Sequence, residues 1–370
     1  MNPKIAIIIG TRAELIKTFP VMLELQKRKI PHYFIHTGQH NLKDLCRDFS
    51  VKNPDAILTE ESEMGSKFKG IGLKGILWNL NIVRKIRKEL KKLKELKYVI
   101  YHGDTMTTAS AAIASSRLLN PFKKYKGVHL EAGLRSENLF EPFPEEISRI
   151  IADFFSDILL AVSKRAEKNL SKYKGKKKIF LVGNTIVDSA EIAYKIAVKK
   201  NIKALSNEKF ALISIHRHEN IKNRKRLNDI AEILSSLKIK SYFPLHDNTK
   251  RKLEEFGLYD KIKANKNIKI IKPLDYINFI YQLSKCSLII CDGGSLQEES
   301  LIFKKPCIIL RKATERQEGL ETNFQFLSKL DVEKTKGKIR EFLSQNFKIK
   351  EFKNPYGEIG VSKKIAEILK

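Results

Sequence analysis

Four side chains that could move protons follow predicted strands or open a predicted helix. Asp104 and Glu131 each come directly after an apolar run, Glu145 begins a helical pattern, and His216 follows a later apolar run. Carboxyl ends of parallel strands meet at one edge of a sheet, so Asp104 and Glu131 lie close together if their strands are neighbours. Each alone is equally well explained by a cap, a surface position or an ion pair. Two carboxylates at adjacent strand ends favour acid/base chemistry.

A glycine-containing loop could hold a phosphate. Residues 292–295 read Asp-Gly-Gly-Ser, and the helix predicted over 296–303 follows them. Adjacent glycines let the backbone approach a ligand, and N–H groups at a helix start bind anions. Glu298 and Glu299 are expected in the first helical turn, where they would repel a bare phosphate. The loop therefore suits a nucleotide sugar, with amides for phosphates and a carboxylate for hydroxyls, although a helix cap is the plain alternative.

Basic side chains near the first predicted helix also indicate an anion. Gly10 ends the first apolar run, and Arg12 and Lys17 lie close to the start of the helix that follows. Positive charges at a helix amino terminus oppose the helix dipole and cost stability. A bound anion explains their placement better than chance. Arg316 follows the last predicted strand, so each half of the chain offers an arginine for a diphosphate.

Composition limits the class of protein. A chain of 370 residues should form about two domains, and its hydrophobic content of 42% is ordinary for a globular protein. The four cysteines are scattered without a CxxC pair, which indicates the reducing cytoplasm and argues against a metal site or a disulfide framework. The apolar run at the start is too short for a signal peptide or a membrane span, so we expect no membrane insertion.

The net charge of +29 comes from 71 basic and 42 acidic residues. Nucleic acid, an anionic membrane surface or an anionic small substrate would each suit such a charge. However, the lysines are spread over nearly every predicted helix and loop, and no zinc-finger, RNA-recognition or basic-zipper pattern occurs. We therefore expect no nucleic-acid partner and attribute the charge to a lysine-rich solvated surface, as in heat-loving organisms.

Apolar runs alternate with amphipathic helical segments along the chain, which is typical of parallel α/β sheets. The predicted strands form two sets separated by a helix and a polar link over 184–207. We therefore predict an α/β fold of two Rossmann-like domains facing a cleft. The strands cover 4–9, 32–36, 98–101, 127–130, 158–161 and 178–182 in the first set, and 210–214, 241–244, 268–271, 288–291 and 307–310 in the second.

Eight short motifs, in order, resemble the non-hydrolysing UDP-N-acetylglucosamine 2-epimerases over nearly the whole chain. Each motif alone is weak, but eight in the same order are highly specific. Ala13 stands where the first motif of the family has proline. The matching segments are Gly-Thr-Arg-Ala-Glu-Leu-Ile-Lys at 10–17, Gln-His at 39–40, His-Gly-Asp-Thr at 102–105, Glu-Ala-Gly-Leu-Arg at 131–135, Pro-Glu-Glu at 144–146, Gly-Asn-Thr-Ile-Val-Asp at 183–188, His-Arg-His-Glu-Asn at 216–220 and Thr-Glu-Arg at 314–316.

The resemblance implies a glycosyltransferase B-like architecture and a homodimer. One domain would comprise residues 1–190 with a returning C-terminal segment, 355–370, and the other the UDP-binding residues 191–354. The implied reaction inverts C2 of a UDP-N-acetylhexosamine, such as UDP-GlcNAc: elimination of UDP leaves a 2-acetamidoglucal, and UDP re-adds with a proton on the other face. No cofactor, nicotinamide or metal takes part.

The resemblance also assigns roles to single residues. The catalytic group would be Asp104, Glu131, Glu145 and His216. The residues that hold UDP or the sugar would be Arg12, Lys17, Arg135, Phe279, Gly293, Gly294, Ser295, Glu299 and Arg316. A regulatory nucleotide-sugar site is partly matched by Gln39, Arg217 and His246.

Departures from the family pattern leave the identity of the sugar substrate open. The family usually has Asp-Ser-Gly-Gly at 292–295 and glutamine at Leu274. The Glu-Glu-Ser at 298–300 and the Glu-Gly at 318–319 are closer to relatives that act on 6-deoxy or 2,3-diacetamido-uronate UDP-hexosamines. A hydrolysing epimerase, which would release UDP and a free sugar, and a glycosyltransferase, which would need an acceptor, are the alternative functions.

Overall fold

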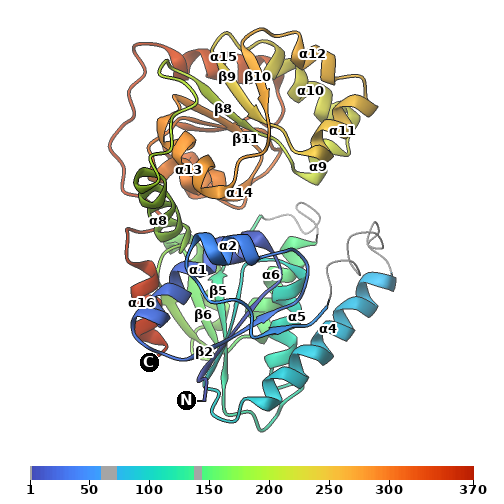
Figure 1. Ribbon diagram of the computed structural model, residues 1–370, viewed down its shortest axis with the longest axis vertical. Coiled ribbons are helices and arrows are strands. Elements are labelled where there is room, and N and C mark those ends of the chain that lie inside the picture. Colours follow the sequence, from blue (N-terminus) through green and yellow to red (C-terminus); the bar gives the residue numbers. More distant parts are fainter. Residues whose placement is uncertain (1, 60–72, 137–143) are drawn as a thin grey trace. The chain divides into compact units, whose positions relative to one another are not determined.

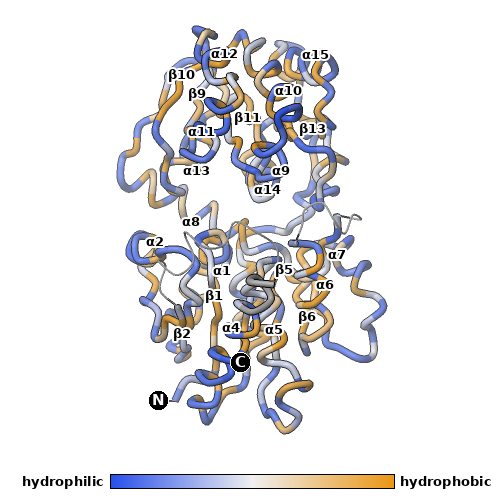
Figure 2. Tube along the Cα trace, turned by 90° about the vertical axis from the view of Figure 1, so that its right-hand side faces the viewer, coloured by the Kyte–Doolittle hydropathy of each residue, from blue (hydrophilic) through white to orange (hydrophobic). Residues whose placement is uncertain are grey.

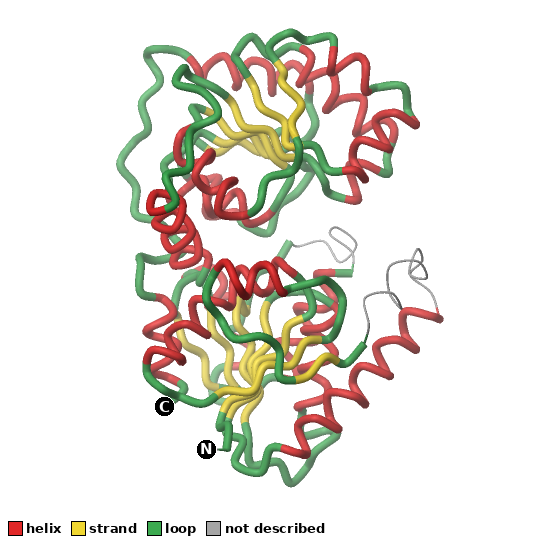
Figure 3. Tube along the Cα trace, viewed as in Figure 1, coloured by secondary structure: helices red, strands yellow, loops and turns green. Residues whose placement is uncertain are grey.

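The computed structural model describes residues 2–59, 73–136 and 144–370 (Figure 1). By its internal contacts the chain forms two compact units. The first unit comprises Met1–Ser189 and Pro355–Lys370, and the second comprises Ala190–Asn354. Each unit holds one parallel sheet flanked by helices (Figure 3). The predicted α/β class with two Rossmann-like domains is confirmed.

The described part of the first unit has a sheet in the order β3-β2-β1-β4-β5-β6-β7. Its strands are β1 (Ile5–Ile9), β2 (His32–His36), β3 (Ala56–Ile57), β4 (Tyr98–His102), β5 (Lys126–Ala132), β6 (Ile158–Ala161) and β7 (Lys178–Leu181). Its helices are α1 (Arg12–Lys27), α2 (Lys43–Asp48), α4 (Leu73–Lys92), α5 (Met106–Ser115), α6 (Glu145–Phe155), α7 (Lys164–Asn169), η1 (Ser171–Tyr173), the start of α8 (Ile186–Lys199) and α16 (Val361–Ile368).

The second unit has a sheet in the order β10-β9-β8-β11-β12-β13. Its strands are β8 (Ala211–Ser214), β9 (Ser241–Pro244), β10 (Ile268–Ile271), β11 (Leu288–Cys291), β12 (Cys307–Ile309) and β13 (Gln325–Leu327). Its helices, after the end of α8, are α9 (His218–Ile221), α10 (Arg224–Ser235), α11 (Asp247–Glu255), α12 (Tyr259–Lys263), α13 (Tyr276–Lys285), α14 (Gly294–Ile302), η2 (Gln317–Glu321) and α15 (Val332–Leu343).

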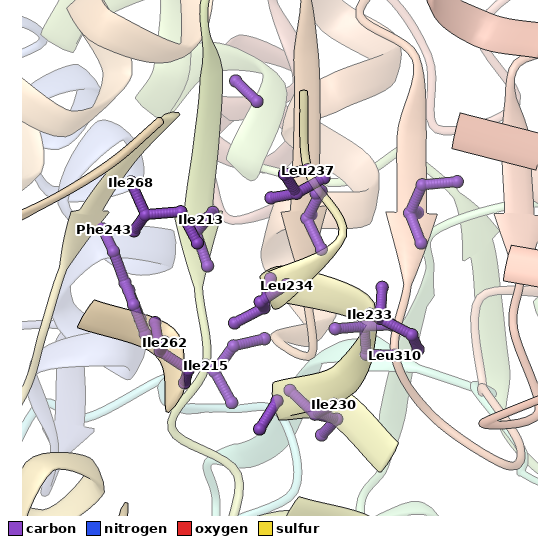
Figure 4. Close-up of a cluster of buried hydrophobic side chains, with 14 of the residues drawn as sticks. Ile213, Ile215, Ile230, Ile233, Leu234, Leu237, Phe243, Ile262, Ile268 and Leu310 are labelled. Atoms are coloured by element: carbon purple, nitrogen blue, oxygen red, sulfur yellow. The ribbon is translucent and has the colours of Figure 1, made fainter. Parts of the chain in front are cut away.

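Buried aliphatic runs account for the strands. β1 and β6 are hydrophobic along their length and fully buried, as expected for strands covered on both faces (Figure 2). In the first unit, side chains of α4, α5 and α6 pack on one face of the sheet. In the second unit, Ile213 and Ile215 pack against α10, with Ile230, Ile233 and Leu234 shown in Figure 4.

The chain end packs on the first unit. α16 lies beside α1 (Figure 1). Asp188, in the first turn of α8, accepts hydrogen bonds from Gly360 N at 2.6 Å and Ser362 N at 2.7 Å, which satisfies N–H groups at the start of α16. Asp188 therefore ties the last helix to the helix that leaves the first unit.

Both sheets have the Rossmann strand order, and both therefore have a switch point where neighbouring connections run in opposite directions. In the first unit this point lies between β1 and β4, which end at Ile9 and His102. In the second it lies between β8 and β11, which end at Ser214 and Cys291. Ligands of such sheets bind beyond the carboxyl ends of the strands at this point.

Candidate active site

Glu131, at the end of β5, has an unusual backbone conformation. It is a non-glycine residue with φ of 65°, in the left-handed region, where a side chain costs about 1–3 kcal/mol. The pairing of β5 with β6 shifts register between Leu130 and Ala132, so Glu131 lies at an irregularity in the ladder. Such irregularities redirect a side chain and are common beside active sites.

The Glu131 carboxylate lies among polar partners although only 8% of the residue is exposed. It forms an ion pair with Lys17 of α1 and accepts a hydrogen bond from Asn184 Nδ2 at 3.2 Å. His102 Nε2 lies 3.7 Å from its second oxygen. Lys17 and Asn184 are 114 and 53 residues away in sequence. Side chains from three separate segments therefore surround the carboxylate of a residue with a strained backbone. This arrangement indicates a functional role.

Asp104 follows β4, and β4 pairs with β5, whose end carries Glu131. The expected neighbourhood of these two strand ends is therefore confirmed. It forms an ion pair with Arg149 of α6. Arg149 also pairs with Glu146 at 2.9 Å, and Glu146 accepts bonds from Ser136 N and Oγ at 3.1 Å. Asp104 is partly exposed while Arg149 is buried, so the guanidinium contacts the carboxylate from the protein interior.

Glu14 joins the first motif to the third. Its Oε2 accepts hydrogen bonds from Gly10 N at 2.8 Å and Thr11 N at 2.7 Å, and its Oε1 accepts one from Thr105 Oγ1 at 2.6 Å. Burial raises the pKa of Glu14, whereas the donors from Thr105, Gly10 and Thr11 act in the opposite direction. The loop after β1 and the loop after β4 are thereby fixed to each other.

The other first-unit candidates are placed as follows. Arg12 is the first residue of α1, and its Nη1 donates to Asn41 O at 3.1 Å. Arg135 donates to Asp153 Oδ2 at 2.5 Å. Glu145 is the half-buried first residue of α6, and Gln39 follows the loop after β2.

Burial lowers the pKa of His102 to about 4, from 6.5, despite the opposing charge of Glu131. Between these values the unfolded chain binds a proton that the folded protein excludes. The contribution of His102 to stability is therefore fully present above pH 6.5 and should fall by up to about 3 kcal/mol as pH decreases to 4. Urea unfolding at pH 7 and pH 4.5 should show a smaller loss for His102→Asn than for the wild type. Equal losses in both proteins would contradict this assignment.

In the second unit, a buried carboxylate positions His216. Asp292 is 0% exposed and accepts hydrogen bonds from His216 N at 3.0 Å, Arg217 N at 3.0 Å and Asn220 Nδ2 at 3.1 Å. The ring of His216 is nearly half exposed, and its Nδ1 lies 3.6 Å from Asp292 Oδ1. The carboxylate thus lies on one side of the ring, as an orienting group does for a catalytic histidine.

A buried ionic cluster surrounds Arg316. The guanidinium pairs with Glu315, and its Nε lies 3.1 Å from Glu298 Oε1. Arg311 pairs with the other oxygen of Glu315 at 3.0 Å. The expected position of Glu298 in the first turn of its helix is wrong, because α14 starts at Gly294. Glu298 and Glu299 are carboxylates with polar partners in the body of the helix. The argument from the helix dipole therefore does not apply to them.

Gly294 lies close to this arginine. A Cβ on Gly294 would lie 2.7 Å from Arg316 Nη1, nearer than real Cβ atoms approach. Gly294→Ala should therefore displace Arg316 and weaken UDP binding about 10-fold, which is about 1.4 kcal/mol. Titration calorimetry with UDP checks this. Gly337→Ala in α15 is the matched control, since its nearest foreign atom is 3.9 Å away, and it should leave UDP affinity unchanged. Equal affinity in both variants would refute the argument.

The remaining second-unit candidates lie on α13 or at the start of α14. Tyr276 donates from its hydroxyl to Glu299 Oε1 at 2.9 Å, and burial together with Glu299 raises the pKa of Tyr276 far above its usual value. Phe279 lies on α13 one turn later and is half-buried. Ser295 is the second residue of α14, and Gly293 is its N-cap.

The candidates for a regulatory site fall in both units, Gln39 in the first and Arg217 and His246 in the second. Arg217 Nη2 lies 3.8 Å from Glu315 Oε1. The His246 ring lies 5.7 Å from that of His216, and burial followed by the His216 charge lowers the pKa of His246. These two residues therefore adjoin the candidate catalytic histidine.

Several residues of these clusters escape sequence reasoning. Asp153 lies in an ordinary helical pattern, and nothing in the sequence pairs it with β5. Arg149 has a weak signal, because it follows Glu146 by three residues on one helix. His102 and Asn184 lie within recognised motifs without a predicted role. Among the described residues no group of three or more His, Cys, Asp or Glu side chains could hold a metal ion.

Comparison with known proteins gives the family. A family model described as UDP-N-acetylglucosamine 2-epimerase matches residues 23–370. A protein of that name from Methanocaldococcus jannaschii is 37% identical, over 99% of this chain and 98% of its own length. A UDP-2,3-diacetamido-2,3-dideoxy-D-glucuronate 2-epimerase from Pseudomonas aeruginosa is 32% identical over 84% of each chain.

A crystal structure of the M. jannaschii UDP-GlcNAc 2-epimerase in complex with UDP-GlcNAc and UDP is similar to this fold. Its TM-score is 0.83 at 35% identity, and the similarity covers 99% of each chain. The motifs, the two Rossmann strand orders and these matches agree. The chain belongs to the UDP-N-acetylglucosamine 2-epimerase family.

Proposed function

We propose that the protein inverts C2 of a UDP-N-acetylhexosamine by elimination and re-addition of UDP. The observation that carries the proposal is Glu131, a buried carboxylate in strained left-handed backbone, paired with Lys17 and next to the strand end that carries Asp104. Strain of this kind persists where it serves a site. The family and the relatives described above supply the reaction to which this carboxylate is applied.

The chemistry needs more than one proton carrier. A base removes the weakly acidic C2 proton, the C–H electrons form the C1=C2 double bond, and the C1–O bond breaks with its electrons on the departing UDP. Re-addition returns UDP to C1 and a proton to the opposite face of C2. We assign Asp104 and Glu131 to the two faces, with Glu145 as a third candidate. A positioned acid or base contributes about 10²–10⁴-fold.

The second unit supplies the groups that suit the leaving diphosphate. The N–H groups of Gly294 and Ser295 open α14 and can bind phosphate oxygens. Arg316 offers positive charge, and His216, oriented by Asp292, can protonate or hydrogen-bond the departing oxygen. Arg12, Arg135, Phe279 and Glu299 are proposed to bind UDP or the sugar, and Gln39, Arg217 and His246 a regulatory nucleotide sugar.

A panel of nucleotide sugars in deuterated water tests the function. UDP-GlcNAc, its 6-deoxy analogue and the 2,3-diacetamido-uronate should be compared by deuterium incorporation at C2. We expect exchange and a UDP-linked C2 epimer, with UDP-GlcNAc preferred because the M. jannaschii relative is more similar than the uronate enzyme. Accumulation of UDP with free sugar would favour the hydrolysing alternative, and no exchange with any donor would sink the proposal.

We also propose a homodimer in the cytoplasm, by analogy with the family. The four cysteines are buried and free, which suits a reducing compartment. No described helix is long and apolar enough to cross a membrane. Light scattering at micromolar concentration should give twice the mass of 42.6 kDa, and a monomer would contradict the dimer.

A further inference from the structure

We propose that His129 is a positioning residue for Asp104 and acts as a buried imidazolium. The inference rests on the proposed function and deepens it. His129 lies on β5, two residues before Glu131, and is 0% exposed. Its Nε2 lies 2.8 Å from the carbonyl oxygen of Gly103, the residue before Asp104, and its Nδ1 lies 2.7 Å from Asp153 Oδ1.

The two partners of the ring determine its charge. A backbone carbonyl oxygen can only accept a hydrogen bond, so Nε2 must carry a proton. The Asp153 carboxylate also accepts a bond from Arg135 Nη2 at 2.5 Å, so it is an acceptor towards Nδ1 as well. Both nitrogens therefore donate, and a ring with two N–H groups is positively charged.

The carboxylate partner is ionised. Burial opposes the charge on Asp153, but the hydrogen bond and charge of His129, followed by Arg135, outweigh it and lower the pKa of Asp153. The ring is thus held by a negative group that is itself 0% exposed. Removing water from such a pair makes it costly to lose either charge.

The other groups around the ring are compatible with this charge. From β4, the Tyr101 ring lies 6.0 Å away by centroids, and the neighbouring His102 is kept neutral by burial, which lowers its pKa to about 4. From the loop after β5, Arg135 shares Asp153, and its Nε lies 3.9 Å from Glu146 of α6. Before β7, Lys177 donates to the backbone oxygen of Asp153 at 2.9 Å. The carboxylates of Asp153 and Glu146 therefore face the His129 ring, Arg135 and Arg149.

The hydrogen bond to Gly103 connects this charge to the catalytic loop. Gly103 has φ of 76°, and its N–H donates to Leu130 O at 3.0 Å. Gly103 is therefore held on both sides. Its N–H, in the peptide group before it, bonds to Leu130, and its carbonyl, in the peptide group that leads to Asp104, is held by His129. A neutral ring would face one of its two acceptors without a proton, and leaving a buried acceptor unsatisfied is unfavourable.

Nitrogen NMR of the full-length protein labelled with ¹⁵N-histidine tests the charge directly. At the pH of maximal turnover, one histidine ring should show protons on both nitrogens, and its signals should disappear in His129→Gln. In Asp153→Asn the same ring should carry one proton. A His129 ring with a single proton in the wild type would overturn the proposal.

Kinetics test the positioning role. Misplacing a catalytic group by about 1 Å can cost about 100-fold, so His129→Gln should lower kcat at least 10-fold. KM and UDP affinity should change less than twofold. His32→Gln is the control: this buried histidine lies at the start of β2 with Nδ1 3.5 Å from Ile30 O, and its loss should leave kcat unchanged.

The outcomes separate this inference from the proposed function. An unchanged kcat in folded His129→Gln would overturn the positioning role, as would an equal loss in His32→Gln. If His129→Gln does not fold, the ring protons of the wild type and the kcat of Asp153→Asn decide. If the wild type epimerises no UDP-hexosamine, the proposed function fails, and the ring protons alone decide the charge of His129.

Discussion

Glu131→Gln should reduce turnover at least about 100-fold while leaving UDP affinity nearly unchanged. Glutamine keeps the size of the side chain and can still accept from Asn184, but it cannot take a proton from C2. It also leaves the ammonium of Lys17 without its carboxylate. Deuterium incorporation at C2 measures the loss, and UDP calorimetry shows whether the second unit is intact.

Another carboxylate, at the opposite end of β5, provides the control. Asp157 pairs with Lys123 at 2.5 Å and accepts from Gly127 N at 2.8 Å, at the amino end of β5. Asp157→Asn should cost stability but not turnover per folded molecule. Asp104→Asn should match the loss of Glu131→Gln, and the double variant should lose far less than the product of the two. Wild-type deuterium exchange in both single variants would refute the assignment.

Arg316→Lys should weaken UDP binding about 10- to 150-fold, or about 1.5–3 kcal/mol, the range for a hydrogen bond to a charged group. Lysine keeps a positive charge beside Glu298 and Glu315 but lacks the planar fork of arginine. Alanine would instead leave these buried carboxylates without the cation, a change that costs about 3–5 kcal/mol in stability. Calorimetry with UDP is the measurement for the lysine variant.

Lys312→Ala controls for the loss of local charge, because Lys312 is an exposed cation in the same loop. Its UDP affinity should stay within twofold of the wild type. If Arg316→Lys binds UDP as the wild type does, Arg316 is a structural ion-pair residue and the diphosphate is held elsewhere. Thermal unfolding of each variant establishes that the compared proteins are folded.

The strands were predictable where apolar runs are long. Runs at 32–36, 158–161, 241–244, 268–271 and 288–291 became strands with the same bounds, since most residues of each run are apolar, as buried parallel strands require. β3 and β13 were missed because one has only two residues and the other begins with a glutamine. Their strand state comes from pairing with β2 and β12, which is tertiary information.

The candidate site was predictable only as separate loops. Strand order alone brings Asp104 next to Glu131, and the motifs supplied both residues. The left-handed backbone of Glu131 has no signal in a one-letter sequence, since that conformation is unusual for glutamate. The start of α14 was misplaced by two residues because Gly294 was read as loop, whereas here a glycine opens the helix beside Arg316.

The position of α16 has a consequence for synthesis on the ribosome. The surface of α1 that it covers is translated well before α16, because the whole second unit lies between the two helices in the sequence. The second unit is nearly contiguous in sequence and emerges complete before this helix does. The first unit therefore waits, nearly finished, through the translation of about half the chain. During that interval the α1 surface that α16 later covers stays exposed to solvent.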